Sequence, residues 1–285
     1  MTGDGFDFAG RLAAARRRLA TLSADALVCF PSRNLQYLCG HYETPGERQF
    51  LLFVPASGDP VFVVPELAAS SARETPVDDV RTWRDETGPR DTLDAVVAEL
   101  GVADGHLLVD DTMWARFTQD LRDVCPDATF GLASEALADL RVHKDDAELA
   151  AMCDAAAVAD AVVERLRERG EEFVGWTEAE LATEIERLLA AEGGEGVAFD
   201  TIVAAGPNGA VPHHRRSDRE IRADDPVVLD FGTRVSGYPS DQTRTLVFGG
   251  DPGERVREVH DVVRAAQAAG VDAVEPGATA GDVDE

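Results

Sequence analysis

The fold of the chain is decided by the stretch from residue 226 to residue 249, PVVLDFGTRVSGYPSDQTRTLVFG. An apolar, β-branched run ends on Asp230, and a second apolar run follows Asp241. Between the two runs lie Ser236 and Gly237, residue types that are typical of turns. Two strand-like runs joined by such a turn predict a β-hairpin.

The position of the turn also predicts how the two acids are placed. With the turn centred on Ser236 and Gly237, Asp241 lies opposite Gly232, and Asp230 lies two residues back on the same face. The two carboxylates are then diagonal neighbours, about 7–8 Å apart at Cα. At that separation both side chains can bind one cation or a close pair of cations, with Gly232 leaving room. A shift of one residue would place the acids on opposite faces.

The chemistry of Asp230 follows from its place on an apolar strand, which we expect to be largely buried. A buried carboxylate without a partner costs free energy, so it needs a base, hydrogen bonds or a metal ion. A second acid on the same face favours a shared cation, although the spacing alone leaves a salt bridge equally open. Oxygen ligands suit Mn²⁺, Mg²⁺ or Ca²⁺, and a histidine would favour Zn²⁺, Co²⁺ or Fe²⁺. Thr243 and Arg244 either support the site or carry a salt bridge on the outer face.

Among the six histidines, His213 is the candidate for substrate binding or proton transfer. It follows Pro212 and the turn at residues 206–209, just ahead of the hairpin. We expect the neighbouring His214 to face solvent. The other four lack acidic or histidine neighbours at ligand spacing, and a structural or surface role is expected for them: His41, His106, His143 and His260.

Length and composition are those of a soluble globular protein of roughly two domains, with 285 residues and 44% apolar content. No apolar run approaches the roughly 20 residues that span a bilayer, so no membrane partner is expected. The first residues lack the charged-then-apolar order of a signal peptide, and a cytoplasmic location is the expectation. The four cysteines have no CxxC spacing, which favours free thiols.

The charge balance is strongly acidic, with 54 acids against 27 bases and a net charge of −27. Nucleic acid is therefore not expected as a partner. Such a surface repels itself at low salt, and screening in molar salt relieves the repulsion. Because Lys144 is also the single lysine of the chain, we predict a salt-loving (halophilic) source. An ordinary acidic cytosolic protein is the alternative.

Residues 1–140 alternate predicted helices and strands, which favours a layered α/β domain. Helical spacing of apolar residues occurs in the segments Phe6–Leu22, Thr92–Leu100 and Met113–Val124. Strand-like segments are Ala26–Phe30, Gln49–Val54, Val61–Val64 and His106–Val109, of which the second and third form a hairpin. Two shorter elements are expected at Leu35–Cys39 and Ser134–Leu140.

We place the domain boundary near Leu140, and residues 141–285 form the second predicted domain. Helices are expected at Asp145–Arg169, Glu178–Ala191 and Glu254–Val274, with a strand at Phe199–Ala204. Thr177 and Glu180 have the spacing of a capping box. Thr279 and Asp282 resemble a helix start, although the chain ends barely one turn later.

At this level of detail the chain resembles the creatinase/prolidase/aminopeptidase P group of pita-bread metallopeptidases. The resemblance covers nearly the whole chain. Asp230 and Asp241 are similar to the group's first two metal ligands, within its SDxTRT pattern at residues 240–245. Residues 206–213, ending on His213, resemble its substrate-binding histidine segment. Further similar segments are the start of the linker helix at residues 141–148 and the N-terminal domain at residues 1–140.

The resemblance implies an α/β creatinase-like N-terminal domain followed by the first half of an α+β pita-bread domain. It further implies an Xaa-Pro dipeptidase or aminopeptidase, acting on small proline-containing peptides and forming a homodimer. Asp230 would hold one metal ion and Asp241 would bridge two, with Mn²⁺ or Co²⁺ as the expected ions and Zn²⁺ as a third possibility. His213 would hold or protonate the substrate near the scissile amide.

The chain also departs from the group's pattern. Three further ligands of the group, a histidine and two glutamates, belong to a second half that this sequence does not contain, so we expect a truncated protein with little or no activity and exposed apolar surface. The alternatives are an inactive or metal-free member with a binding or remnant role, and a creatinase-like amidinohydrolase, which needs neither Asp230 nor Asp241. Methionine aminopeptidase shares the aspartates, but it lacks a domain like residues 1–140.

Overall fold

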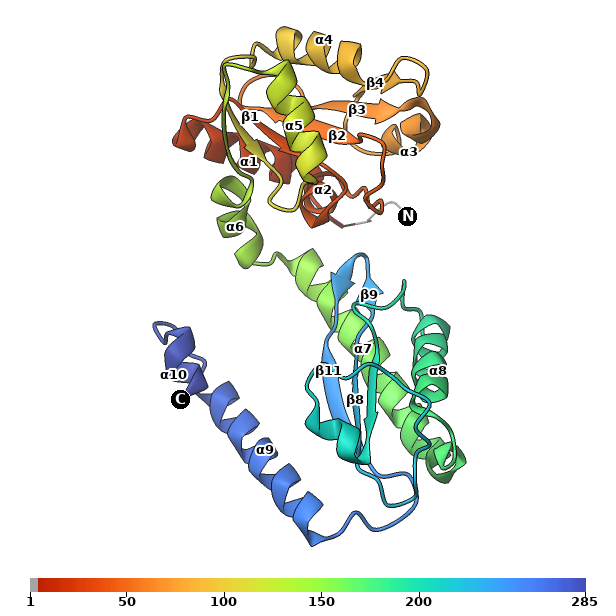
Figure 1. Cartoon of the computed structure of the whole chain (residues 1–285). Helices are drawn as coiled ribbons and strands as arrows, with labels where there is room; N and C mark the ends of the chain where they lie inside the picture. The colour runs from red at the N-terminus through yellow and green to blue at the C-terminus, as the bar shows by residue number, and fades with distance from the viewer. Residues whose placement is uncertain (1–4) are drawn as a thin grey trace. The chain divides into compact units, whose positions relative to one another are not determined.

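The computed structural model describes residues 5–285 (Figure 1). The chain divides into two compact units, one that ends at Leu149 and one that comprises Ala150–Glu285. The sequence predicts a domain boundary near Leu140. In the structure, the two compact units divide within helix α7 (Asp146–Arg169). No helix within residues 5–285 is long and apolar enough to cross a membrane.

The first unit is built on a mixed sheet of six strands in the order β4-β3-β2-β1-β5-β6. Strand β1 pairs antiparallel with β2 and parallel with β5, and β2 and β3 form the predicted hairpin. The strands are β1 (Ala26–Cys29), β2 (Leu51–Pro55), β3 (Val61–Pro65), β4 (Asp79–Trp83), β5 (His106–Val109) and β6 (Thr129–Leu132).

Helices cover both faces of this sheet, because β1 is apolar on both sides. Leu27 and Cys29 lie in one core cluster with residues of α1, α2 and α6, whereas Ala26 and Val28 lie in the other with residues of α4 and α5. The helices are α1 (Phe8–Leu22), α2 (Arg33–Cys39), α3 (Ala69–Ala72), α4 (Arg90–Leu100), α5 (Ala115–Val124) and α6 (Ser134–Val142), with the 3-10 turn η1 (Glu66–Ala68). The layered α/β architecture predicted for this part is confirmed.

Two strands, β4 and β6, were not predicted from the sequence. Both lie at an edge of the sheet, where alternate side chains meet solvent and the apolar signal is weak. In β4 only Trp83 is buried, and β6 has no buried residue. Strand β6 also contains Gly131, where an added Cβ would lie 2.7 Å from the Leu108 side chain. Their sequences therefore do not resemble those of the buried strands.

The second unit contains a three-stranded antiparallel sheet in the order β11-β8-β7. Helices α7 and α8 (Glu178–Ala191) pack on one face, where Leu166 and Ile185 meet Leu229 and Phe231 in a common core. The strands are β7 (Ile202–Ala205), β8 (Val227–Phe231) and β11 (Gln242–Leu246), with the short pair β9 (Arg234–Val235) and β10 (Tyr238–Pro239) and the turns η2 (Gly170–Phe173) and η3 (Gly206–Ala210).

The hairpin has the predicted register. Thr243 pairs with Asp230 at one end and Tyr238 pairs with Val235 at the other, which centres the turn on Ser236 and Gly237. Both turn residues have positive φ, 50° and 81°. That is the type I′ turn, whose twist matches the flanking strands. Asp230 and Asp241 are therefore diagonal neighbours on one face.

Two helical predictions at chain positions outside the sheet are also confirmed. Helix α8 begins with the capping box of Thr177 and Glu180, and α10 (Ala280–Asp284) begins with that of Thr279 and Asp282.

Helix α9 (Glu254–Asp272) has no buried residue. Its exposed apolar side chains confirm the expected apolar surface: Val259, Val262, Val263 and Val271.

Candidate metal centre

Asp230 lies on the central strand β8, which is buried on one face and not on both. Val227, Leu229 and Phe231 are fully buried, whereas Val228 and Asp230 are only partly covered. The strand is largely buried, as expected, and it is less completely covered on the face that carries Asp230. The reason is that α7 and α8 cover the opposite face of the sheet.

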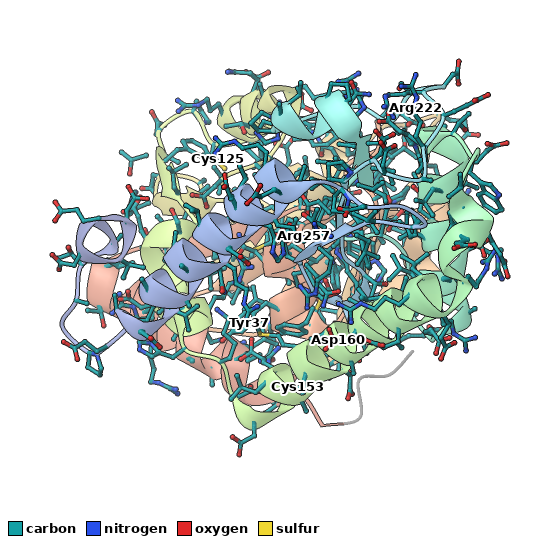
Figure 2. All side chains as sticks on the ribbon, turned by 90° about the horizontal axis from the view of Figure 1, so that it is seen from below. Tyr37, Cys125, Cys153, Asp160, Arg222 and Arg257 are labelled. Carbon is teal, nitrogen blue, oxygen red and sulfur yellow. The ribbon has the colours of Figure 1, made fainter. Side chains whose placement is uncertain are left out.

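Thr243 lies directly across from Asp230 and contacts its carboxylate. The Thr243 hydroxyl donates a hydrogen bond of 3.1 Å to Oδ1 of Asp230. Arg244 points to the other face, where its guanidinium lies 3.5 Å from Asp160 of α7. Figure 2 labels Asp160 on this helix. Thr243 thus supports Asp230, and Arg244 forms a solvent-exposed salt bridge with α7.

Asp241 precedes β11 and is exposed. The adjacent Ser240 fixes this part of the backbone, because its amide donates to the Thr233 carbonyl at 2.8 Å and its hydroxyl accepts from the Thr233 amide at 3.1 Å. Gly232 has a different role from the one expected. A Cβ added there would lie 1.9 Å from the Ser240 carbonyl oxygen, so glycine is required for the close approach of two backbones.

The electrostatics of Asp230 link the three candidate residues. Burial raises the pKa of Asp230, and the hydrogen bond from Thr243 opposes this increase. The negative charge of Asp241 raises the pKa of Asp230 further, whereas His213 lowers it. The net result is a raised pKa. A divalent cation between the two carboxylates would relieve the repulsion that Asp241 exerts.

The donor set fits a divalent cation, but it is small. Asp230 and Asp241 offer carboxylate oxygens on one face of the sheet, which suit a hard cation that keeps several water ligands. Within residues 5–285, no group of three or more histidine, cysteine, aspartate or glutamate side chains is placed to hold a metal ion. The hairpin therefore offers two candidate carboxylates, and two carboxylates alone would hold a cation weakly.

His213 and His214 lie in the loop between η3 and β8, and they differ in exposure. The His213 side chain is exposed. The His214 side chain is only 13% exposed, and its Nε2 lies 2.7 Å from Oε2 of Glu178. The expectation that His214 faces solvent is therefore wrong, because a buried carboxylate 36 residues away in the sequence binds its ring.

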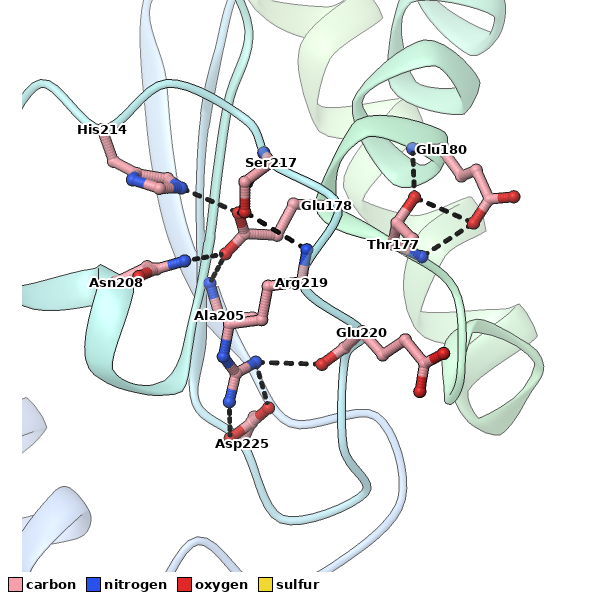
Figure 3. Close-up of polar contacts among 10 residues, drawn as sticks. All are labelled: Thr177, Glu178, Glu180, Ala205, Asn208, His214, Ser217, Arg219, Glu220 and Asp225. Carbon is pink, nitrogen blue, oxygen red and sulfur yellow. Dashed lines mark hydrogen bonds and ion pairs between the residues drawn. The ribbon is translucent and has the colours of Figure 1, made fainter.

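Glu178 is the buried, hydrogen-bonded acid at this site that the sequence did not reveal. It is the first residue of α8, and its side chain is fully buried. Figure 3 shows its carboxylate between Asn208, His214 and Ser217. In the sequence, the capping box of Thr177 and Glu180 already accounts for acidic residues at the start of this helix, so burial of Glu178 was not predicted. A glutamate at the first helical position of an otherwise apolar helix face was the available signal.

The remaining histidines form no metal cluster within the described residues. His41 stacks on Phe50, with ring centroids 4.9 Å apart. Nδ1 of His106 lies 2.9 Å from the hydroxyl of Thr129. His143 and His260 are exposed. His41 also has an acidic neighbour, because its Nε2 lies 3.3 Å from Oε2 of Glu43.

Family models and known proteins identify the class of protein. The Creatinase/Prolidase N-terminal domain matches residues 11–143, and Metallopeptidase family M24 matches residues 150–285. The chain is 37% identical over 284 residues to a probable dipeptidase PepE of Mycobacterium tuberculosis, covering 97% of this chain and 73% of that protein. It is 30% identical to an Xaa-Pro dipeptidase of Pyrococcus horikoshii, covering 92% of this chain and 70% of that protein.

Solved structures agree with this similarity. A prolidase from Thermococcus sibiricus superposes with a TM-score of 0.92 at 33% identity, covering 98% of this chain and 76% of that chain. The dipeptidase PepE from Mycobacterium ulcerans has a TM-score of 0.85 at 39% identity, covering 98% and 75%. The chain therefore belongs to metallopeptidase family M24, with a creatinase/prolidase N-terminal domain, and spans about three quarters of these relatives.

Proposed function

We propose that the protein is a metal-dependent hydrolase of peptide bonds that precede proline, of the Xaa-Pro dipeptidase or aminopeptidase type. The observation that carries the proposal is the hairpin register, which places Asp230 and Asp241 as diagonal neighbours on one face. The relatives named as prolidases and Xaa-Pro dipeptidases support the substrate class. Small proline-containing peptides are the proposed substrates.

Asp230 and Asp241 would hold the metal. A divalent ion bound there supplies Lewis-acid chemistry, which lowers the pKa of water and stabilises developing negative charge. The hydroxyl of Thr243 would keep Oδ1 of Asp230 oriented toward the hairpin face. Mn²⁺ or Co²⁺ are the proposed ions, and Zn²⁺ is the third, because the pair offers oxygen ligands.

His213 would bind or protonate the substrate near the scissile amide. Its ring is exposed, and its charge lowers the pKa of the Asp230 carboxyl. An exposed imidazole at the edge of a metal site can donate a hydrogen bond to a carbonyl or carboxylate of a peptide. In this assignment His213 orients the peptide, and the two aspartates hold the ion.

The chain as it stands is proposed to turn over slowly, because its described residues supply two carboxylates and no larger ligand group. This same observation favours the second candidate, a metal-free or inactive member that binds peptides without cleaving them. A creatinase-like amidinohydrolase is disfavoured, because such an enzyme needs neither Asp230 nor Asp241.

Peptide binding and proline release distinguish the two candidates. The chain is incubated with Mn²⁺ and with Ala-Pro or Ala-Ala, and both binding and free proline are measured. The proposal predicts preferential binding of Ala-Pro and slow proline release that is lost in Asp241→Asn. If Ala-Pro binds to Asp241→Asn, and to the chain without Mn²⁺, as tightly as to the unmodified chain with Mn²⁺, the metal-free alternative is supported. Equal binding of the two dipeptides would contradict both.

Three further properties are proposed from the sequence: a homodimeric state, a cytoplasmic location and adaptation to high salt. The first rests on the family resemblance. The third rests on the net charge of −27 together with a single lysine. Sedimentation at low and high salt measures the first property, and the salt dependence of unfolding measures the third.

A further inference from the structure

The carboxylate of Glu178 accepts five hydrogen bonds inside the second unit, although its side chain is fully buried. Oε1 accepts from the Ala205 amide at 2.8 Å and from the Asn208 side chain at 2.9 Å. Oε2 accepts from the His214 ring at 2.7 Å and from Ser217, whose hydroxyl is at 2.7 Å and whose amide is at 3.1 Å. Figure 3 shows these donors converging on one side chain.

All five donors belong to one segment of the chain, residues 205–217. Ala205 is the last residue of β7, Asn208 lies in η3, and Ser217 lies beyond the two histidines. The carboxylate therefore binds the segment at its beginning, its middle and its end. His213 lies between these anchoring points, and its own side chain makes no hydrogen bond to another residue in the described part of the chain.

The charge of Glu178 is maintained by these donors. Burial alone would raise the pKa of Glu178, but the bonds from Ala205, Ser217, His214 and Asn208 lower it below its ordinary value. An ionised carboxylate has only acceptor sites and can satisfy all the donors at once. A glutamine would present an amide NH₂ to part of the same set. The Ser217 amide or the Ala205 amide would then lose its acceptor.

We propose that Glu178 is a positioning residue for His213, and this inference rests on the proposed function of His213 as the substrate-binding histidine. The carboxylate fixes His214, the neighbour of His213, and both ends of the loop. It thereby holds the backbone on both sides of the exposed His213 ring in place. Glu178 touches neither substrate nor metal, and it acts through the backbone that it binds.

The test compares the 285-residue chain with two variants that carry the same chemical change on the same helix. Glu178→Gln removes one acceptor oxygen from the network. Glu180→Gln is the matched control, because Glu180 is exposed and its carboxylate accepts from the helix cap Thr177. Crystal structures give the distance between the His213 ring and Asp230 in each protein. Binding of Mn²⁺ and, in its presence, of Ala-Pro gives the functional consequence.

In Glu178→Gln we expect the His213 ring to move away from Asp230 while the hairpin keeps its register. Affinity for Ala-Pro is expected to fall by about tenfold or more, whereas Mn²⁺ affinity stays unchanged, since the metal ligands lie on the hairpin. A purely structural role would weaken both affinities together. Glu180→Gln should leave the His213 position and both affinities unchanged. His213 in its original place in Glu178→Gln would overturn the proposal.

A second variant and a readout that does not depend on ligand binding keep the test decisive. Should Glu178→Gln fail to fold, Glu178→Asp keeps the charge but shortens the side chain, and the same displacement of His213 is expected. Absence of Mn²⁺ and Ala-Pro binding in all three proteins would refute the proposed function. The position of His213 in the crystals would still decide whether Glu178 positions it.

Discussion

The hydroxyl of Thr243 donates to the carboxylate of Asp230 across the hairpin, at 3.1 Å and between directly paired residues. This contact lowers the pKa of Asp230 against burial and the charge of Asp241, both of which raise it. Thr243 therefore helps to keep the carboxylate in the ionised form that a cation needs. Protons and the proposed metal ion would compete for Asp230.

The first prediction concerns Thr243→Val, which removes the donor with little change in volume. The pKa of Asp230 should rise further, so the pH at which Mn²⁺ binding is half-lost should move upward. Metal binding measured as a function of pH checks this shift. Thr245→Val is the control, because Thr245 lies two residues along the same strand and pairs with Val228. Equal shifts in both variants would contradict the assigned role of Thr243.

The second prediction concerns Gly232→Ala. The added Cβ would meet the Ser240 carbonyl at 1.9 Å, so one strand has to move. We expect a loss of about 1–3 kcal/mol or more in unfolding free energy, together with weaker Mn²⁺ binding as Asp241 shifts. Urea unfolding gives the first quantity. Gly46→Ala, where an added Cβ meets nothing within 4 Å, should be close to neutral. Similar losses in both variants would contradict the steric explanation.

The third prediction is a pH dependence of stability from Glu184. Hydrogen bonds from Arg187 and then Arg169 lower its pKa to about 2, against the effect of burial. Because the pKa in the folded state is depressed, the stabilisation is complete above the unfolded-state pKa and is lost as pH falls toward about 2. Glu184→Gln should therefore flatten the acid side of the stability curve.

Urea unfolding between pH 7 and pH 2 measures this flattening. Glu168→Gln, a change at an exposed position of α7, serves as the control. A curve for Glu184→Gln that is as steep in acid as that of the unmodified chain would show that this ion pair contributes no pH-dependent stability.

The fourth prediction concerns salt. With 54 acids against 27 bases, the folded chain repels itself, and the repulsion is screened over about 3 Å at molar salt. The unfolding temperature should rise between dilute buffer and 2 M KCl. An uncharged osmolyte at matched osmolality is the control for general solute exclusion. A protein that is equally stable in dilute buffer and in molar salt would refute the halophilic interpretation.

Features that depend on local sequence were predictable. The register of the hairpin follows from Ser236 and Gly237, since a two-residue turn fixes which residues face each other. Helix α8 begins where Thr177 and Glu180 indicate, because both partners of a capping box are close in the sequence. The diagonal placement of Asp230 and Asp241 is a consequence of the same local geometry.

Features that depend on distant contacts were not predictable. The contact between His214 and Glu178 joins residues 36 positions apart, and no spacing rule connects a helix start with a loop after a strand. The edge strands β4 and β6 lack the apolar pattern because solvent covers part of them. The weaker burial of β8 on the face that carries Asp230 was missed for a related reason: the apolar run does not show which face the helices cover.

The most direct test of the account is a titration of the chain with Mn²⁺, followed by the loss of the free-ion electron paramagnetic resonance signal. We predict weak binding that falls by about tenfold or more in Asp230→Asn and in Asp241→Asn. Asp104→Asn, a change at an exposed position of the first unit, should leave it unchanged. Mn²⁺ binding that is the same in the chain and in both hairpin variants would contradict the central claim that this pair of aspartates holds the metal.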